Sequence, residues 1–326
     1  MYRISVPFLG FFSEWNRARE CGTVRVSLIG DTSYPNVAFQ KISTFHKCRG
    51  DIVGLNLAYP DIVYMSVLFS WNLPIMLGKK AMLESQGKVV NIGGSGYKVD
   101  SRLPECIEEC PPDPELYGHL DYSFGFITRG CIRNCEFCIV PKKEGWLKFE
   151  GLDWMVKDRC VVYDNNLLAY GKHRDILIAM RQGGQQICFS QGLDIRLVDK
   201  VNAGLLSEIK YRSLSFKVPR LYFAYDYDTP IMEQMIRDKV ELLVSAGIPA
   251  KHLMFYVLYA YESNPQLALD SLQHRYAVLK ELGVKCYPMN FRKGDKRYSL
   301  CHRFARYVIR RYDEFLTFDQ YCEGKK

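Results

Sequence analysis

Three cysteines in the stretch TRGCIRNCEFC, namely Cys131, Cys135 and Cys138, are spaced four and three residues apart. A structural zinc site normally uses four ligands, and the bacterial ferredoxin run spaces its cysteines as C-x2-C-x2-C, so this spacing matches neither. Three thiolates can hold three irons of a four-iron, four-sulfur cluster and leave the fourth iron open to a substrate or cofactor. The triplet therefore indicates a catalytic iron–sulfur centre.

Zinc is the main alternative for these cysteines, because Cys106 and Cys110 lie upstream and could complete a four-ligand set with members of the triplet. That upstream pair lies in an acidic, proline-rich stretch, whereas the triplet directly follows a strand-like run. Since a motif counts only in its structural context, the cluster is the favoured interpretation, and zinc stays open as the alternative.

The triplet, with Phe137 immediately before its last cysteine, resembles the radical S-adenosylmethionine (radical SAM) superfamily over about residues 122–290. The resemblance implies that Cys131, Cys135 and Cys138 ligate a 4Fe-4S cluster, whose open iron binds S-adenosylmethionine. It also implies that the main chain of Phe137 borders the adenine. An electron from an external donor such as a flavodoxin or ferredoxin then cleaves the cofactor to a 5′-deoxyadenosyl radical, which abstracts hydrogen from an unidentified substrate.

Polar residues follow the second strand of this core. The superfamily usually has a Gly-Gly-Glu-like segment there that holds the methionine amine, whereas this chain has YDNN and offers Asp164, Asn165 and Asn166. Carboxylate and amide oxygens can accept hydrogen bonds from an ammonium group. The resemblance therefore assigns these three residues to the cofactor site.

The third strand ends in FSQGLDIRL, which contributes Gln191, Asp194 and Arg196 as cofactor-binding candidates. Arg196 could clamp a carboxylate in a bidentate pair, and Asp194 could take a ribose hydroxyl or an amine. A structural Asp194–Arg196 ion pair is an equally open interpretation, since ion-pair networks also gather at strand ends.

The next two strand ends supply the remaining candidates. FAYDYD closes the fourth strand, and Asp226 or Asp228 either reaches the pocket or caps the helix that begins at Pro230. YVLYAYES resembles the segment that passes beneath the adenine and contains Leu258 and Ala260. Ala260 stands where relatives often carry glycine, and its small side chain still allows close backbone approach.

Parallel strands are the scaffold that these residues require. Beyond residue 120, strand-like runs alternate with helical ones six times, from SFGFIT to KCYPM. This pattern predicts an α/β fold, a TIM-barrel-like partial (β/α)6 barrel over residues 121–295, with its chemistry at the carboxyl ends of the strands. Residues 101–120, with four prolines, predict a linker, and residues 296–326 predict a C-terminal helical extension.

Residues 1–100 predict a smaller Rossmann-like α/β domain. Its order of elements resembles the cobalamin-binding domain that precedes many radical SAM cores. That domain often supplies an Asp-x-His-x-x-Gly motif, from which Thr44, Phe45, His46 and Gly50 depart in identity and spacing. We therefore expect a degenerate relative, in which cobalamin binding is disfavoured.

Three functions are compatible with these features. The first is a radical SAM enzyme acting on an unidentified substrate. The alternatives are a cobalamin-dependent radical SAM methyltransferase and a non-enzymatic, zinc- or cluster-stabilised module that binds nucleic acid. Relatives that attach methylthio groups to tRNA carry a second cysteine triplet and a C-terminal RNA-binding domain, and neither is apparent in this sequence.

The composition indicates which partners and which cellular compartment we expect for the protein. The net charge of +8 weakly favours an anionic partner, although basic residues are spread along the chain and do not strongly indicate nucleic acid. The longest apolar runs fall short of the roughly 20 residues that a membrane span requires. With no secretory signal apparent, we expect a cytoplasmic protein whose twelve cysteines stay reduced.

Overall fold

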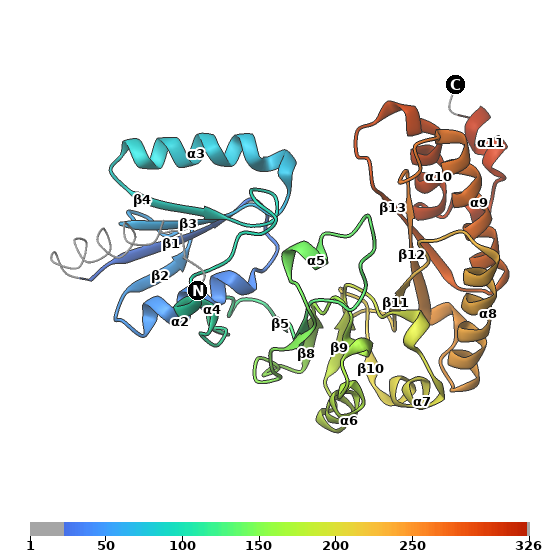
Figure 1. Ribbon diagram of the computed structural model, residues 1–326, viewed down its shortest axis with the longest axis horizontal. Coiled ribbons are helices and arrows are strands. Elements are labelled where there is room, and N and C mark those ends of the chain that lie inside the picture. Colours follow the sequence, from blue (N-terminus) through green and yellow to red (C-terminus); the bar gives the residue numbers. More distant parts are fainter. Residues whose placement is uncertain (1–22, 325–326) are drawn as a thin grey trace, which may run out of the picture. The chain divides into compact units, whose positions relative to one another are not determined.

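The computed structural model describes residues 23–324 of the chain (Figure 1). The chain divides into two compact units. The first ends at Asp121 and takes in Lys142–Glu144, and the second comprises Tyr122–Pro141 and Gly145–Lys326. Both units combine helices with parallel strands, which confirms the predicted mixed α/β class.

The first unit is built on a parallel sheet with the strand order β2-β1-β3-β4. Its elements are β1 (Arg25–Gly30), α2 (Val37–Lys47), β2 (Ile52–Leu55), β3 (Ile62–Ser66), η1 (Ser70–Asn72), α3 (Leu73–Ser85), β4 (Val89–Gly93) and α4 (Glu105–Glu108). Helix α3 covers one face of the sheet, and α2 with α4 covers the other (Figure 1). All five residues of β3 are buried, because helices cover both of its faces.

Residues 101–120 pack along α2 of the first unit. Ile107 is fully buried in the core between α2 and the sheet. The Lys41 ammonium donates to the carbonyl oxygen of Glu108 at 2.6 Å, and the Ser43 hydroxyl donates to Asp113 Oδ2 at 2.7 Å. This segment is therefore attached to the first unit along its length, and its role as an interdomain linker stays a prediction.

The second unit contains two parallel sheets and a short antiparallel pair. The sheet orders are β10-β9-β8-β5 and β11-β12-β13, and β6 pairs with β7. The strands are β5 (Ser123–Gly125), β6 (Thr128–Arg129), β7 (Lys148–Phe149), β8 (Arg159–Val162), β9 (Gln186–Phe189), β10 (Lys210–Tyr211), β11 (Leu221–Ala224), β12 (Leu253–Tyr259) and β13 (Lys285–Asn290). A single parallel bridge between Leu193 and Phe223 joins the segment after β9 to β11.

Helices follow most of these strands. They are α5 (Val140–Lys143), η2 (Leu167–Ala169), α6 (His173–Gly183), η3 (Ile195–Leu197), α7 (Lys200–Glu208), α8 (Pro230–Ser245), η4 (Ala250–His252), α9 (Pro265–Glu281), η5 (Lys296–Tyr298), α10 (Ser299–Ile309), η6 (Tyr312–Glu314) and α11 (Phe318–Glu323). Helix α10 packs on β13 and α9 and buries Phe304, so the C-terminal segment contributes to the core of this unit.

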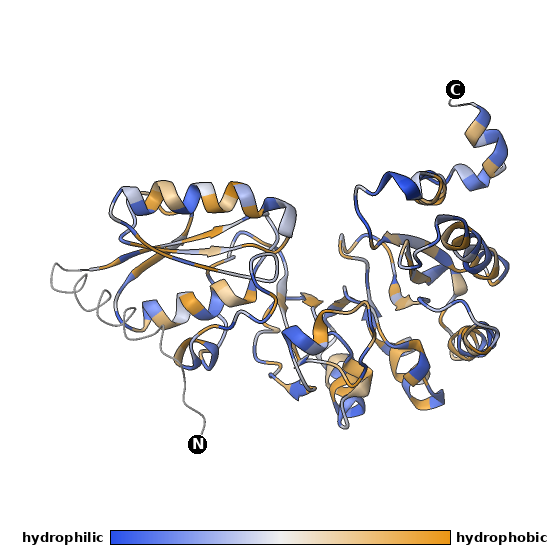
Figure 2. Ribbon diagram, turned by 45° about the horizontal axis from the view of Figure 1, so that its top comes forward, coloured by the Kyte–Doolittle hydropathy of each residue, from blue (hydrophilic) through white to orange (hydrophobic). Residues whose placement is uncertain are grey.

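Strand β12 shows how sequence alternation builds the second unit. Leu253, Phe255 and Val257 are buried in the core against the helices, whereas Tyr256 and Leu258 point to the other face and are half-buried. Hydrophobic residues concentrate on the strands and on the helix faces turned towards them (Figure 2). Among residues 23–324, no helix combines the length and apolar character that crossing a membrane requires.

Candidate functional site

The cysteine triplet occupies the loop after β5 and β6, at the carboxyl edge of the parallel strands of the second unit. All three thiols are half-buried. Burial raises the pKa of Cys138, and the nearby Cys135 and Cys131 raise it further. Gly130 precedes them with φ of +92°, and a Cβ there would lie 2.5 Å from the Trp146 carbonyl oxygen, so glycine is required at this turn.

Polar hydrogens point at two of the three sulfurs. The backbone N–H of Arg133 donates to Cys131 Sγ at 3.3 Å, and the N–H of Val140 donates to Cys138 Sγ at 3.5 Å. The Asn166 amide also donates to Cys131 Sγ, at 3.4 Å. Such donors stabilise thiolates and tune a metal centre bound to them.

Asp164 anchors the strand that leads into the triplet. Its Oδ1 accepts from the Ile127 N–H at 2.7 Å, and its Oδ2 accepts from the Thr128 N–H and hydroxyl at 2.7 and 2.6 Å. Burial raises the pKa of Asp164 to about 6, although the three hydrogen bonds act in the opposite direction. The carboxylate is thus already occupied by protein donors, and its assignment to the cofactor stays a prediction.

The raised pKa of Asp164 should be visible in the free energy of unfolding. A carboxyl group that holds its proton more tightly in the folded chain contributes stability fully below about pH 4, and loses it as the pH rises towards about 6. Two pH units correspond to about 3 kcal/mol. We therefore expect the destabilisation caused by Asp164→Asn, measured by urea unfolding, to be larger near pH 4 than near pH 7 by up to about 3 kcal/mol. An equal cost at both pH values would contradict this assignment.

Asn165 and Asn166 follow directly and point to different partners. Asn165 Oδ1 accepts from the Gly130 N–H at 3.1 Å and so supports the turn before the triplet. Asn166 is 2% exposed, and its Nδ2 donates to Cys131 Sγ and to Asp194 Oδ2. Within the part of the chain that the structure describes, its Oδ1 is buried without a hydrogen-bond partner. This leaves an acceptor beside Cys131 for a donor from outside the chain.

Asp194 holds two arginines beside the triplet. Arg196 donates through Nε to Asp194 Oδ1 at 2.6 Å and through Nη2 to Oδ2 at 3.0 Å, while Arg133 Nε donates to Oδ2 at 3.1 Å. Burial alone would raise the pKa of Asp194, but Arg196 and then Arg133 outweigh it and lower the pKa. The structural pair considered from the sequence is therefore present, and the Nη1 group of Arg196 is not used by it.

Asp226 lies at the next strand end and does not cap a helix. The N-cap of α8 is Thr229, whose hydroxyl accepts from the Met232 N–H at 3.2 Å, and Asp228 instead pairs with His274. The capping role predicted for Asp226 or Asp228 is therefore wrong: Thr229 directly precedes the helix and supplies the acceptor itself.

The Asp226 carboxylate is held at the strand ends. It accepts from the Leu258 N–H, and burial raises its pKa against the opposing charges of Arg275 and Arg196. Arg275 is fully buried on α9 and donates to the carbonyl oxygens of Tyr225, Asp226 and Leu258 at 2.8, 3.2 and 2.9 Å. This arginine fixes the ends of β11 and β12 relative to each other.

Ala260 directly follows β12 in a left-handed conformation, with φ of +62°. It is fully buried, and its carbonyl oxygen accepts from Arg292 Nε at 3.0 Å. Because this region of backbone space favours glycine, an alanine here is held in a conformation that its side chain disfavours.

Aromatic rings surround Phe137. Its ring centroid lies 5.9 Å from that of Tyr227 and 5.6 Å from that of Tyr261. The Tyr227 hydroxyl hydrogen-bonds with Cys135, and burial, followed by Cys135, raises the pKa of Tyr227 to about 12. The Tyr261 hydroxyl donates to Glu136 at 2.8 Å. The fourth and fifth strand ends thus meet the loop that carries the triplet.

Sequence reasoning missed Arg133, Tyr227 and Arg275, and its assignment of Gln191 to the cofactor site stays a prediction. Gln191 is exposed and makes no hydrogen bond with any residue in the described range. Arg133 could have been noticed as a cation inside the ligand loop, and Tyr227 as an aromatic residue between two strand-end aspartates. Nothing in the local sequence marks Arg275, because its partners lie on β11 and β12.

The upstream cysteines form a separate group in the first unit. Cys110 Sγ donates to the Cys106 carbonyl oxygen at 3.2 Å. Burial raises the pKa of Cys110, and the nearby Cys48 and Cys106 raise it further. Cys48 therefore lies near the Cys106–Cys110 pair, which its position in the sequence did not indicate. In residues 23–324, no three or more His, Cys, Asp or Glu side chains are arranged to hold a single metal ion.

Comparisons with known proteins return distant relatives. No family model matches the chain. The ribosomal protein uS12 methylthiotransferase RimO of Chlorobium phaeobacteroides (strain BS1) is 25% identical over 172 residues, which cover 52% of this chain and 34% of that protein. The chain therefore spans about a third of the length of this relative. The structure of the apo, SeMet-labelled cobalamin-dependent S-adenosylmethionine radical enzyme OxsB matches with a TM-score of 0.39 and 13% identity, over 82% of this chain and 49% of that one.

Proposed function

We propose that the chain is a radical S-adenosylmethionine enzyme, and that Cys131, Cys135 and Cys138 of its second unit hold a 4Fe-4S cluster. The observation that supports this proposal is that three half-buried thiols share one loop after β6, with backbone N–H groups donating to two of the sulfurs. When bound, the cluster and S-adenosylmethionine supply a 5′-deoxyadenosyl radical that takes a hydrogen atom from the substrate.

The neighbouring residues fit the polar ends of S-adenosylmethionine. The unfilled Oδ1 of Asn166 would accept from the methionine ammonium, and the Nη1 group of Arg196 would donate to the methionine carboxylate. Asp194 orients both side chains, since it already bonds to each. In this arrangement the protein supplies charge matching and orientation at the open iron.

The adenosine end would lie against the later strand ends. The main chain of Phe137 would border the adenine, as the superfamily resemblance implies, with Leu258 and Ala260 beneath it. Asp226 closes this side of the site, with its carboxylate fixed by the Leu258 N–H. In this proposal the left-handed turn at Ala260 would lie against the adenine.

The finer architecture belongs to the same proposal. We assign residues 121–295 to a partial (β/α)6 barrel made from both parallel sheets of the second unit, with residues 296–326 as its helical extension. The parallel bridge between Leu193 and Phe223 supports this assignment, because it connects the two sheets in sequence order. We assign residues 1–100 to a Rossmann-like domain, which the doubly covered parallel sheet supports.

Cobalamin does not fit His46, the residue nearest to a ligand motif in the first unit. His46 is fully buried, with Nδ1 2.7 Å from Asp51 Oδ2 and Nε2 3.0 Å from the Tyr64 hydroxyl. Both ring nitrogens are therefore engaged within the core and neither is available to cobalt. No step of the proposed reaction passes through cobalamin.

Anaerobic reconstitution tests the proposal directly. Protein treated with iron and sulfide should bind about four iron and four labile sulfide per chain. After reduction with dithionite, it should convert S-adenosylmethionine to methionine and 5′-deoxyadenosine, measured by liquid chromatography. One electron enters for each cofactor cleaved, and the adenosyl carbon gains one hydrogen atom. Stoichiometric zinc without labile sulfide would instead support the binding-module alternative.

A further inference from the structure

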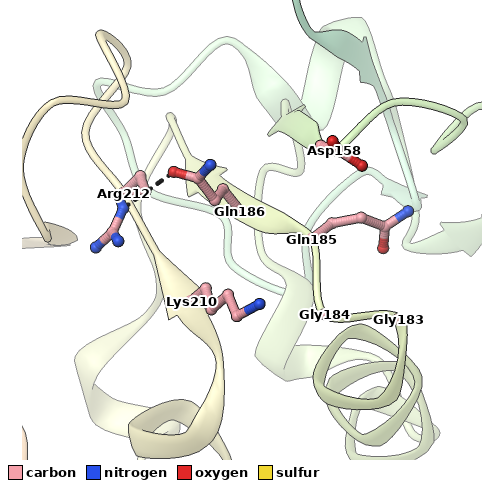
Figure 3. Close-up of a pocket in the computed structure, with 7 residues that line it drawn as sticks. All are labelled: Asp158, Gly183, Gly184, Gln185, Gln186, Lys210 and Arg212. Carbon is pink, nitrogen blue, oxygen red and sulfur yellow. Dashed lines mark hydrogen bonds between the residues drawn. The ribbon is translucent and has the colours of Figure 1, made fainter.

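A cavity of about 430 Å³ opens at the amino ends of β8, β9 and β10 (Figure 3). The cysteine triplet follows the carboxyl ends of the strands, so the cavity lies at the opposite edge of the sheet. Its polar side chains are Asp158, Gln185, Gln186, Lys210 and Arg212. Its size falls in the range of roughly 300 to 1,000 Å³ that small-molecule sites occupy. None of these residues takes part in the site described above.

The two cations of this cavity are not neutralised. Arg212 donates through Nε to Gln186 Oε1 at 3.1 Å, drawn as the dashed line in Figure 3, and its two terminal nitrogens are left unused. The Lys210 ammonium makes no hydrogen bond or ion pair with any residue in the described range. Asp158 is the one carboxylate of the lining, and it pairs with neither cation. The cavity therefore carries excess positive charge.

Arg220 extends this positive region just before β11. Arg220 is 9% exposed and donates through Nη1 to the Lys251 carbonyl oxygen at 2.7 Å. Among the described residues, no carboxylate forms an ion pair with it. His252 connects Arg220 to the cavity: burial lowers its pKa, as do Lys251, Arg220 and Arg212. An enclosed guanidinium without a counter-charge costs free energy unless an anion joins it.

The positive excess is confined to the ends of β10, β11 and β12. Further along the edge, burial lowers the pKa of Lys285, and the positive charges of Arg311 and Arg220 lower it further. The acidic side chains of Glu314 and Asp313 oppose this shift by raising the pKa of Lys285. Arg311 is itself paired with Glu314. Acidic groups thus balance the cations at β13, and they do not do so around Arg212 and Arg220.

We propose that this amino edge is a second binding site, which takes a small ligand through a phosphate group. The free fork of Arg212 matches two phosphate oxygens, Lys210 adds a point charge, and the Nε2 group of Gln186 can donate to the rest of the ligand. The Gln185 amide already donates to the Met155 carbonyl oxygen at 2.9 Å. Lys210 also lies near Gly184, at the carboxyl end of α6, where a cation stabilises the helix dipole. That role does not account for Arg212 or Arg220.

Isothermal titration of the 326-residue chain with inorganic pyrophosphate tests this site. Lys210→Gln and Arg212→Gln should each weaken binding about tenfold, because each removes a charge-assisted contact to phosphate. Lys200→Gln removes an equal charge from an exposed position at the start of α7, at the other edge, and should change the affinity less than about twofold. Cys135→Ala should bind pyrophosphate like the wild type, so this result does not depend on the proposed enzyme activity.

Two outcomes would overturn the proposal. One is pyrophosphate binding that is absent, or that is unchanged in both Lys210→Gln and Arg212→Gln. The other is a short single-stranded RNA that binds with the expected dependence on Lys210 and Arg212 while pyrophosphate does not bind, because the site would then recognise a polymer backbone and not a small phosphorylated ligand.

Discussion

Replacing Cys135 by alanine is expected to abolish both cluster binding and the reductive cleavage of S-adenosylmethionine. The two remaining thiolates of the triplet cannot anchor three irons, so the fourth iron would lose its defined position. Cys135 also lies near the side chains of Tyr227 and Arg196. Iron, labile sulfide and 5′-deoxyadenosine should all fall to background after anaerobic reconstitution and reduction.

Cys48→Ala is the matched control, because it removes an exposed thiol of the first unit. It should retain the iron, sulfide and cleavage rate of the wild type. Circular dichroism of Cys135→Ala should show the helix and strand content of the parent, since a half-buried loop thiol contributes little to the core. Cleavage at the wild-type rate by Cys135→Ala would remove the basis of the proposed function.

Most strands of the second unit could be predicted from the sequence, because buried strands show a clear run or alternation of apolar residues. The run LMFYVLYA predicts β12 through its period-two alternation of large apolar residues, and the structure confirms a strand at Leu253–Tyr259. The short strand β10 was missed: its two residues, Lys210 and Tyr211, are too few to show a period. Pairing with β9, a contact distant in sequence, defines it.

The polar contacts of the site were less accessible, because they depend on chain segments that meet only after folding. YDNN indicated acceptors for a cofactor amine, yet Asp164 bonds to Ile127 and Thr128 from a different strand. A pattern of residue types cannot tell whether a strand-end carboxylate faces a ligand or a neighbouring backbone. The same limit applied to the helix cap predicted for Asp226 or Asp228, because Thr229 is the N-cap of α8.

Asp194 shows the limit most clearly, since the sequence could not distinguish a structural ion pair from a cofactor contact. The pair with Arg196 lies two residues away along the chain and was foreseeable. Arg133 and Asn166 reach the same carboxylate from two other loops. The folded chain therefore makes Asp194 a structural partner and, through Arg196 and Asn166, a positioning residue for the proposed cofactor.

Substituting Asp194 by asparagine is accordingly expected to slow S-adenosylmethionine cleavage by roughly 10- to 100-fold, the usual cost of losing a group that orients residues around a metal centre. An amide has one acceptor oxygen and cannot serve both arginines, so Arg133 and Arg196 would lose their fixed positions. Iron and sulfide contents should stay at the wild-type level, because the triplet is intact. The KM for S-adenosylmethionine should rise, since the group that orients its proposed carboxylate contact is lost.

Glu208→Gln is the comparison that isolates this effect, because it also removes one carboxylate from an arginine pair. Glu208 pairs with Arg181 at 2.8 Å on the exposed surface of α6 and α7, where an ion pair contributes little. This variant should keep the wild-type KM and cleavage rate. Loss of iron from Asp194→Asn would indicate a collapsed loop, whereas an unchanged KM and rate would show that Asp194 does not position the cofactor. If Asp194 acts by holding Arg196 and Asn166 beside the triplet, then Asp194→Asn should keep its full iron content and show a higher KM for S-adenosylmethionine.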